Sequence, residues 1–243
     1  HLRLKYAMTL DGKIAARDGS SQWISCERSR DYVQTLRMQS DAILIGSGTA
    51  LRDQPRLNVR NVALPQPKRV IADSRLRLTP EMPLFSHTGG EFIVFHALEK
   101  PEGKAAALEK IGVKVIACPG DDGKVDLYQA LKALARDHGV RNVLCEGGAT
   151  LNAALVHKKL ADSAAVFIAP KILGGSGIAP MESATAYPSP TPPGSWERKS
   201  KRSMTTSTCT ATSSIPPDRP VARRRGVGEK PTKKAGRRGL LFR

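Results

Sequence analysis

The chain has 243 residues, 40% of them hydrophobic, which allows one sizeable core and a small additional segment. No apolar run approaches the roughly 18 residues of a membrane span, and no basic-then-apolar signal pattern is present, so we expect a soluble cytoplasmic protein. The four cysteines lack metal-ligand or redox spacing, which argues against zinc and predicts reduced thiols. The net charge of +17 is uneven, because residues 184–243 hold 14 lysines and arginines against three acids.

Up to residue 180, short apolar runs rich in β-formers alternate with helical patterns. This alternation predicts an α/β fold with a mainly parallel central sheet flanked by helices. The expected strands are Leu2–Met8, Ala42–Gly46, Arg69–Ala72, Phe92–Phe95, Val113–Ala117, Asn142–Cys145 and Ala164–Ala169. The expected helices are Glu27–Gln39, Glu102–Ile111, a helix that begins at the N-cap Asp126, and Ala149–His157.

The character of the sequence changes after Glu182. Seven prolines lie between residues 188 and 220, among serine, threonine and arginine, with almost no periodic apolar residues. Such a segment cannot build a packed core, and no part of it has the pattern of a strand. We therefore predict one domain over residues 1–182 and a disordered basic tail over residues 183–243.

Four polar or glycine-rich stretches lie where a nucleotide could bind. They are Lys5–Lys13 with Ser20–Ile24 soon after, Ile45–Ala50, Asp73–Arg75 and Cys145–Asn152. Glycines after a buried strand let backbone N–H groups approach a phosphate, and a hydroxyl and a guanidinium after a strand could hold a ribose 2′-phosphate. Taken singly, each stretch has a structural alternative: a tight turn for Cys145–Asn152, a solvated loop for Ile45–Ala50, a core tryptophan for Ser20–Ile24 and a chance surface group for Asp73–Arg75.

Together and in this order, the stretches resemble the RibD-type reductase domain of bacterial riboflavin synthesis, a dihydrofolate-reductase-like domain. The matching passages are Lys5–Lys13 (KYAMTLDGK), Ser21–Ile24 (SQWI), Ala42–Pro55 (AILIGSGTALRDQP), Leu57–Arg60, Arg69–Arg75 (RVIADSR), Asn142–Asn152 (NVLCEGGATLN) and Ile168–Gly175 (IAPKILGG). The resemblance implies a homodimeric enzyme that uses NADPH to reduce the ribosyl group of 5-amino-6-(5-phosphoribosylamino)uracil to a ribityl chain.

The resemblance also implies roles for individual residues, by motif position. NADPH contacts would come from Ala7, Trp23, Thr49, Asp53, Ser74, Gly148, Ala149, Thr150, Leu151 and Asn152. Substrate contacts would come from Ser21, Arg37, Leu57, Arg60 and Glu146. The guanidinium forks of Arg37 and Arg60 suit the substrate's phosphate. Lys13 would stabilise developing oxygen charge or donate a proton, so Lys13 and Glu146 are the expected catalytic residues, with no metal.

The sequence departs from the family in two ways. It lacks the His-x-Glu and Pro-Cys-x-x-Cys zinc signature of the deaminase half, so we do not predict deamination. The family also closes its sheet with two further strands, and nothing after Glu182 resembles one. We hypothesise a reading-frame shift, because the shifted register permits a helix over Pro188–Trp196, a strand over Trp196–Ser203 and a terminal strand over Ser203–Ser213. The basic charge of the tail would then be accidental.

Two other functions remain open at this point. The same fold serves dihydrofolate reductases and reductases of other pterins or pyrimidines, although Arg37, Arg60 and Glu146 favour a phosphorylated sugar. Alternatively, the clusters Arg223–Arg225, Lys233–Lys234 and Arg237–Arg238 could bind nucleic acid without sequence specificity. Because no aromatic residues interleave with them to stack on bases, we expect no specific nucleic-acid partner. Since no apolar run is long enough to span a bilayer, we expect no membrane partner either.

Overall fold

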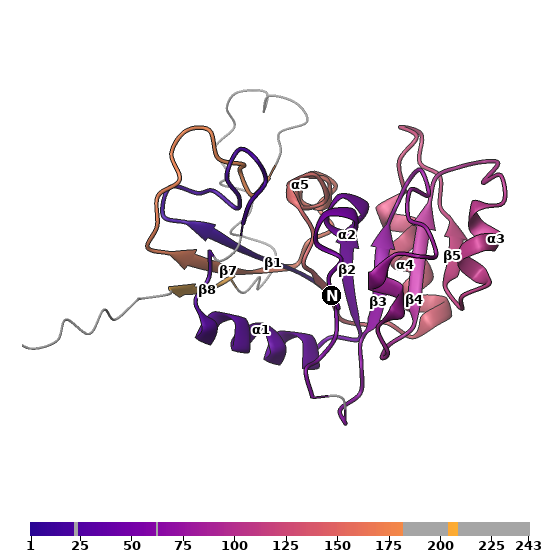
Figure 1. Cartoon of the computed structure of the whole chain (residues 1–243), viewed down its shortest axis with the longest axis horizontal. Coiled ribbons are helices and arrows are strands. Elements are labelled where there is room, and N and C mark those ends of the chain that lie inside the picture. Colours follow the sequence, from indigo (N-terminus) through magenta and orange to yellow (C-terminus); the bar gives the residue numbers. More distant parts are fainter. Residues whose placement is uncertain (22–23, 62, 182–203, 209–243) are drawn as a thin grey trace, which may run out of the picture. The chain divides into compact units, whose positions relative to one another are not determined.

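The computed structural model describes residues 1–21, 24–61, 63–181 and 204–208, which all belong to one compact unit, residues 1–211 (Figure 1). The strands of this part form one sheet of order β5-β4-β3-β2-β6-β1-β7-β8, in which every pairing is parallel. The strands are β1 (Leu2–Thr9), β2 (Ala42–Gly46), β3 (Lys68–Ala72), β4 (Phe92–His96), β5 (Lys114–Ala117), β6 (Val143–Cys145), β7 (Ser163–Ala169) and β8 (Met204–Thr208). The predicted α/β class and parallel sheet are confirmed.

The helices of the described part connect these strands. They are α1 (Glu27–Met38), α2 (Ser47–Asp53), α3 (Lys104–Glu109), α4 (Leu127–His138), α5 (Ala149–His157) and the 3-10 helix η1 (Pro83–Ser86). The predicted N-cap is confirmed, since the Asp126 carboxylate accepts hydrogen bonds from the backbone N–H groups of Tyr128 and Gln129. None of these helices is long and apolar enough to cross a membrane.

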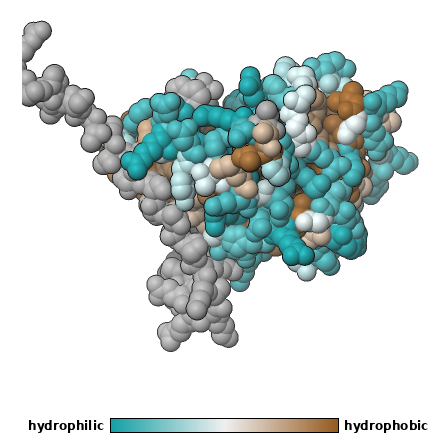
Figure 2. Space-filling model, turned by 90° about the horizontal axis from the view of Figure 1, so that it is seen from below, coloured by the Kyte–Doolittle hydropathy of each residue, from teal (hydrophilic) through white to brown (hydrophobic). Residues whose placement is uncertain are grey.

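The two faces of the sheet are covered by different helices. On one face, Leu44 of β2 belongs to the same cluster as Leu134 of α4 and Leu155 of α5. On the other face, Val33 of α1 packs with Phe167 of β7 (Figure 1). Because both faces are covered, the central strands are almost continuously apolar. One view of the surface is mostly hydrophilic with small, separate hydrophobic patches, as expected when the core lies inside (Figure 2).

Three features differ from the sequence-based expectations. No strand is expected after Glu182, yet β8 pairs with β7 in parallel, with Ala164 opposite Met204. Hydrophobic periodicity cannot reveal β8, because its sequence MTTST is mostly polar, although threonine favours strands. The expected loop after β2 is the short helix α2, which has too few residues to show a period. Finally, Cys118 and Cys145 are free thiols but Cys26 is disulfide-bonded, a pairing that sequence spacing does not reveal.

Candidate active site

Three residues from the stretches singled out by the sequence lie at one edge of the sheet. Glu146 follows β6 directly, Ser47 follows β2 and Asp73 follows β3. These three strands are neighbours or next neighbours in the sheet and run in the same direction. Their carboxyl ends therefore meet at the same edge, which is where open α/β sheets bind ligands.

A buried ion pair stands at this edge. Arg37, in the last turn of α1, holds Glu146 with two hydrogen bonds, Nε to Oε1 at 2.7 Å and Nη2 to Oε2 at 2.9 Å. Its Nη1 donates to the backbone C=O of Asn58 at 2.9 Å. The two side chains are only 15% and 10% exposed. Burial would raise the pKa of Glu146, but the charge and hydrogen bonds of Arg37, with the charge of Lys5, hold that pKa below its ordinary value.

Lys5 completes this cluster, and sequence reasoning gave it no role. It lies on β1, on the side of the sheet that α1 covers, with its Nζ 5.8 Å from the centroid of the Phe167 ring. Burial lowers the pKa of Lys5, partly opposed by the negative charge of Glu146, and the charge of Arg37 lowers it further. The signal that could have identified Lys5 is a lysine in the middle of the strand LRLKYAMT. A charge that is shielded from solvent is costly unless it is paired.

Lys13, which the resemblance makes a catalytic residue, lies in the turn that follows β1. Its backbone closes the turn after β1, because its N–H donates to the Oγ1 of Thr9 at 2.9 Å and its C=O accepts from the Thr9 N–H at 2.8 Å. Its side chain packs against Gly177, where an added Cβ would lie 2.7 Å from the Lys13 Cγ. Asp11 in the same turn accepts hydrogen bonds from the backbone N–H groups of Leu173 and Gly174, so it ties the β1 turn to the loop after β7.

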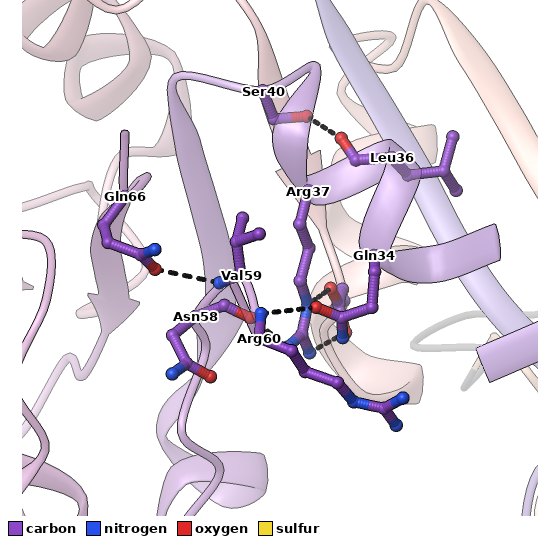
Figure 3. A network of polar contacts seen from close by, with 9 residues as sticks. Gln34, Leu36, Arg37, Ser40, Asn58, Val59, Arg60 and Gln66 are labelled. Carbon is purple, nitrogen blue, oxygen red and sulfur yellow. Dashed lines mark hydrogen bonds and ion pairs between the residues drawn. The ribbon is translucent and has the colours of Figure 1, made fainter. Parts of the chain in front are cut away.

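The loop that carries Arg60 runs alongside α1 (Figure 3). The backbone N–H of Arg60 donates to the Oε1 of Gln34 at 2.9 Å, and its Nη1 lies 3.0 Å from the Oδ1 of Asp31. The Arg60 and Asp31 side chains are 62% and 59% exposed. Leu57 has a left-handed backbone, with φ of 47°, and its side chain is buried in the core, so only its backbone can contact a ligand. The structure therefore brings Arg37, Arg60 and Glu146 to the same region.

On the other side of Glu146, the chain turns tightly into α5. An added Cβ on Gly147 would lie 2.7 Å from the Leu151 Cδ2, and one on Gly148 would lie 3.3 Å from the Thr49 Oγ1 of α2. Gly148 is the N-cap of α5 and, as a glycine, has no side chain of its own to cap the helix. The N-terminus of a helix carries the positive end of the helix dipole, which favours an anion. Small residues at a helix N-terminus fit the diphosphate of a dinucleotide such as NADPH.

The remaining expected cofactor residues occupy varied positions. Thr49, Gly148, Ala149 and Thr150 lie where α2 meets the start of α5, and Asp53 ends α2. Burial raises the pKa of Asp53, with the charge of Arg52 acting in the opposite direction. Leu151 and Asn152 are buried, and Ala7 packs against the cluster of Val33 and Phe167. The Oγ of Ser74 accepts a hydrogen bond from the Val125 N–H. Ser21, expected to contact substrate, is exposed, and Trp23 lies outside the described residues.

Comparison with known proteins identifies the family. The family model for the RibD C-terminal domain matches residues 1–191. The chain belongs to this family, the pyrimidine reductases of riboflavin biosynthesis. It is 35% identical over 175 residues to the riboflavin biosynthesis protein RibD of Actinobacillus pleuropneumoniae, covering 72% of this chain and 46% of that protein. The chain thus spans about half the length of the RibD proteins that it matches.

Two further relatives, one matched by sequence and one by structure, support the same family. The 2,5-diamino-6-ribosylamino-4(3H)-pyrimidinone 5′-phosphate reductase of Methanothermobacter thermautotrophicus is 39% identical over 175 residues, covering 71% of this chain and 78% of that protein. Among solved structures, a deaminase/5-amino-6-(5-phosphoribosylamino)uracil reductase from Thermotoga maritima has a TM-score of 0.66 at 30% identity, covering 79% of this chain and 50% of that one. The fold and the family therefore agree with the resemblance of the sequence motifs.

Proposed function

We propose that the chain reduces the ribosyl group of 5-amino-6-(5-phosphoribosylamino)uracil to the ribityl group, with NADPH as the hydride donor. The observation that carries this proposal is the cluster of Lys5, Arg37 and Glu146 beside the glycine turn that opens α5. On one side of this edge of the sheet, charged side chains can contact the polar sugar that reacts. The other side offers backbone amides and small residues for a dinucleotide.

Glu146 acts as a fixed hydrogen-bond acceptor in this proposal. Since its pKa lies below the ordinary value, it is ionised at neutral pH and cannot serve as the acid. Arg37 donates two hydrogen bonds to Glu146 and one to the backbone C=O of Asn58, so its role is to position the carboxylate. The remaining lone pairs of Glu146 can accept a hydrogen bond from a hydroxyl of the substrate's sugar.

Arg60 is the residue we assign to the substrate's phosphate. Its guanidinium is exposed, and its contact with Asp31 is a surface pair that an incoming phosphate can replace at little cost. Its backbone N–H is bonded to Gln34 of α1, the helix that also carries Arg37. Such a cation binds substrate and transition state equally and should act on KM more than on kcat.

Lys5 is the cation that we place beside the reacting carbon. Opening of the sugar ring creates a C=N bond between C1 and the amine nitrogen, hydride adds to C1, and the nitrogen takes up a proton. A partly buried ammonium with a lowered pKa releases a proton more readily than an ordinary lysine and can stabilise the developing charge. When bound, NADPH supplies the hydride, and the chain's own residues supply alignment and the proton.

A substrate assay tests this proposal. Wild-type protein should oxidise NADPH when the deaminated phosphoribosyl pyrimidine is added, and mass spectrometry should identify the ribityl product. A second candidate substrate is the undeaminated pyrimidinone 5′-phosphate, favoured by the 39% identity to the Methanothermobacter reductase. The ratio of kcat/KM for the two decides between them. Saturable NADPH oxidation with dihydrofolate, and none with either phosphoribosyl compound, would overturn the proposal.

Several expectations remain predictions. They are the homodimer, the cytoplasmic location, the division between residues 1–182 and 183–243, the disorder of the tail and its origin in a frame shift. Apart from Met204–Thr208, residues 182–243 lie outside the described part of the chain. The coding DNA tests the frame shift, since an open frame that yields no strand in the shifted register would refute it.

A further inference from the structure

A second arginine stands at the carboxyl edge of the sheet, away from the Arg37–Glu146 pair. Asp73 follows β3 and begins a turn, in which the backbone N–H of Leu76 donates to the C=O of Asp73 at 3.0 Å. Leu76 takes up a left-handed conformation, with φ of 45°, and the side chains of Leu76 and Leu78 are buried. Arg77 lies between these two leucines, and its side chain instead reaches Ser47 at the end of β2.

The guanidinium of Arg77 is held from two sides but remains accessible. Its Nη2 donates to the Oγ of Ser47 at 2.6 Å, and its Nε lies 3.6 Å from the Oδ1 of Asp73. The Arg77 side chain is still 51% exposed. Ser47 opens α2, the helix whose Thr49 lies against Gly148. A half-exposed cation therefore stands beside the helix pair that borders the expected diphosphate site.

Asp73 is arranged to hold this arginine. Its carboxylate is fully buried, and its Oδ2 accepts hydrogen bonds from the backbone N–H groups of Arg77 at 2.6 Å and Leu78 at 3.0 Å. Within the described residues, its Oδ1 has no hydrogen-bond partner, since 3.6 Å from the Arg77 Nε is too long. A small movement of the guanidinium would complete that bond. A buried acceptor without a donor is costly, which is why we regard Asp73 as a positioning residue for Arg77.

We propose that Arg77 binds the 2′-phosphate of NADPH and thereby selects NADPH over NADH. The proposal rests on the proposed function and on the strand order β3-β2-β6-β1. If the reacting end were held near Lys5 of β1 and the diphosphate at α5, which follows β6, the adenosine end would extend over β2 toward β3. Arg77 is the cation held at that position. Ser74 lies in the same turn, and because its Oγ accepts from the Val125 N–H, its own O–H can donate to the phosphate.

Arg75 is the competing candidate, since the sequence alone allows either guanidinium of this turn to meet the phosphate. Its side chain is exposed, and no hydrogen bond or ion pair to it is recorded among the described residues. A freely solvated arginine must lose side-chain entropy before it can bind, whereas Arg77 is already oriented by Ser47 and Asp73. The two arginines carry the same charge and lie two residues apart, so they form a matched pair for mutation.

Calorimetry with adenosine 2′,5′-bisphosphate and 5′-AMP on the full chain tests the proposal without requiring turnover. Wild type should bind the bisphosphate more tightly than 5′-AMP. Arg77→Gln should lose about 10- to 100-fold in affinity for the bisphosphate, with little change for 5′-AMP, while Arg75→Gln should lose less than about threefold. Arg77→Lys, which keeps the charge but loses the fork, should give an intermediate value and serves if Arg77→Gln does not fold.

The outcomes separate this inference from the proposed function. If wild type prefers the bisphosphate but both Arg77 variants keep the preference, or if Arg75→Gln is the variant that loses it, Arg77 is not the selecting residue and the reductase proposal stands. If wild type shows no preference for the bisphosphate, both the selection by Arg77 and the use of NADPH are refuted. In the reductase assay, Arg77→Gln should reduce kcat/KM with NADPH and leave it unchanged with NADH.

Discussion

The two halves of the candidate site recognise their ligands by opposite means. Around Glu146, three charged side chains are buried together, and each restrains another. Around Gly148, the site depends on missing side chains at the N-terminus of a helix. In the first region a mutation removes a partner and leaves a buried charge, whereas in the second it adds atoms to a crowded turn. The Arg37–Glu146 pair should therefore be sensitive in both stability and kcat, and the second region mainly in cofactor binding.

Removal of the central carboxylate should have the largest effect. Glu146→Gln leaves Arg37 and Lys5 buried without a counter-charge, which should cost about 3 to 5 kcal/mol of stability and most of kcat. Urea unfolding and steady-state rates measure the two losses. Glu91→Gln is a control, because Glu91 also holds two lysines but is 28% exposed, and it should cost less than about 1 kcal/mol. Wild-type unfolding and rates for Glu146→Gln would contradict the account.

The same carboxylate should give wild type a specific pH dependence. Because the pKa of Glu146 is lower in the folded chain, its contribution to stability is fully present above the ordinary value of 4.5. That contribution is lost as the pH falls from there through the lowered value. Glu146→Gln should lack this component, so the difference in unfolding free energy between the two proteins should shrink in acid.

Replacement of Lys5 should separate catalysis from stability. Lys5→Met should lower kcat about 100-fold or more and leave the KM for NADPH unchanged. Since burial lowers the pKa of Lys5, the charged lysine costs stability at neutral pH, and this cost falls only as the pH rises through the lowered pKa. Thermal melts at neutral pH should therefore show no loss for Lys5→Met.

Two measurements can refute this role of Lys5. In wild type, kcat should decline as the pH rises through a value below the ordinary 10.5 of lysine, and this decline should be absent from Lys5→Met. Lys13→Met provides the comparison, because the family resemblance assigned the acid to Lys13. If that variant loses more kcat than Lys5→Met, the proton donor lies in the turn after β1.

Arg60 should affect substrate binding alone. Arg60→Ala should raise the KM for the phosphorylated substrate about tenfold or more at nearly constant kcat, because a charge-assisted bond to the phosphate is lost. Its exposed contact with Asp31 contributes little, so the melting temperature should barely change. Asp31→Asn is the matched control and should not raise KM. An equal rise in KM for both variants would mean that the ion pair, and not Arg60 itself, is required.

The glycine-rich turn should show the smallest effect and the clearest restriction to the cofactor. Gly148→Ala places a Cβ 3.3 Å from the Thr49 Oγ1 and should raise the KM for NADPH several-fold, with a stability loss of about 1 kcal/mol. Gly175→Ala, at a glycine with nothing within 4 Å of an added Cβ, is the control and should change neither. A change in substrate KM without a change in NADPH KM would show that the two regions are not distinct.

The sequence was most informative where burial imposes a pattern. The seven expected strands appear because central parallel strands must be apolar, and the helix from Asp126 to His138 appears because its period and cap agree. These successes depend on local rules that act within about ten residues of chain. The family resemblance, in contrast, assigned Arg37, Arg60 and Glu146 to the substrate, and of these Arg37 and Glu146 form an ion pair.

The parts that were missed depend on partners far along the chain. Lys5 acquires its role only when α1 and β6 bring Arg37 and Glu146 to β1. Arg77 could not be preferred to Arg75 until Ser47 was known to lie beside it. β8 is polar, and its pairing with β7 is the feature that defines it as a strand. Tertiary contacts of this kind leave no periodic signal in the sequence.

Transfer of deuterium from labelled NADPH tests the central claim most directly. The account predicts that wild type, given NADPH deuterated at C4 of the nicotinamide and the phosphoribosyl pyrimidine, forms a product with deuterium at C1 of the ribityl chain. Glu146→Gln should form almost none. A product labelled in the pyrimidine ring, or NADPH left unconsumed by the folded wild type, would contradict the account.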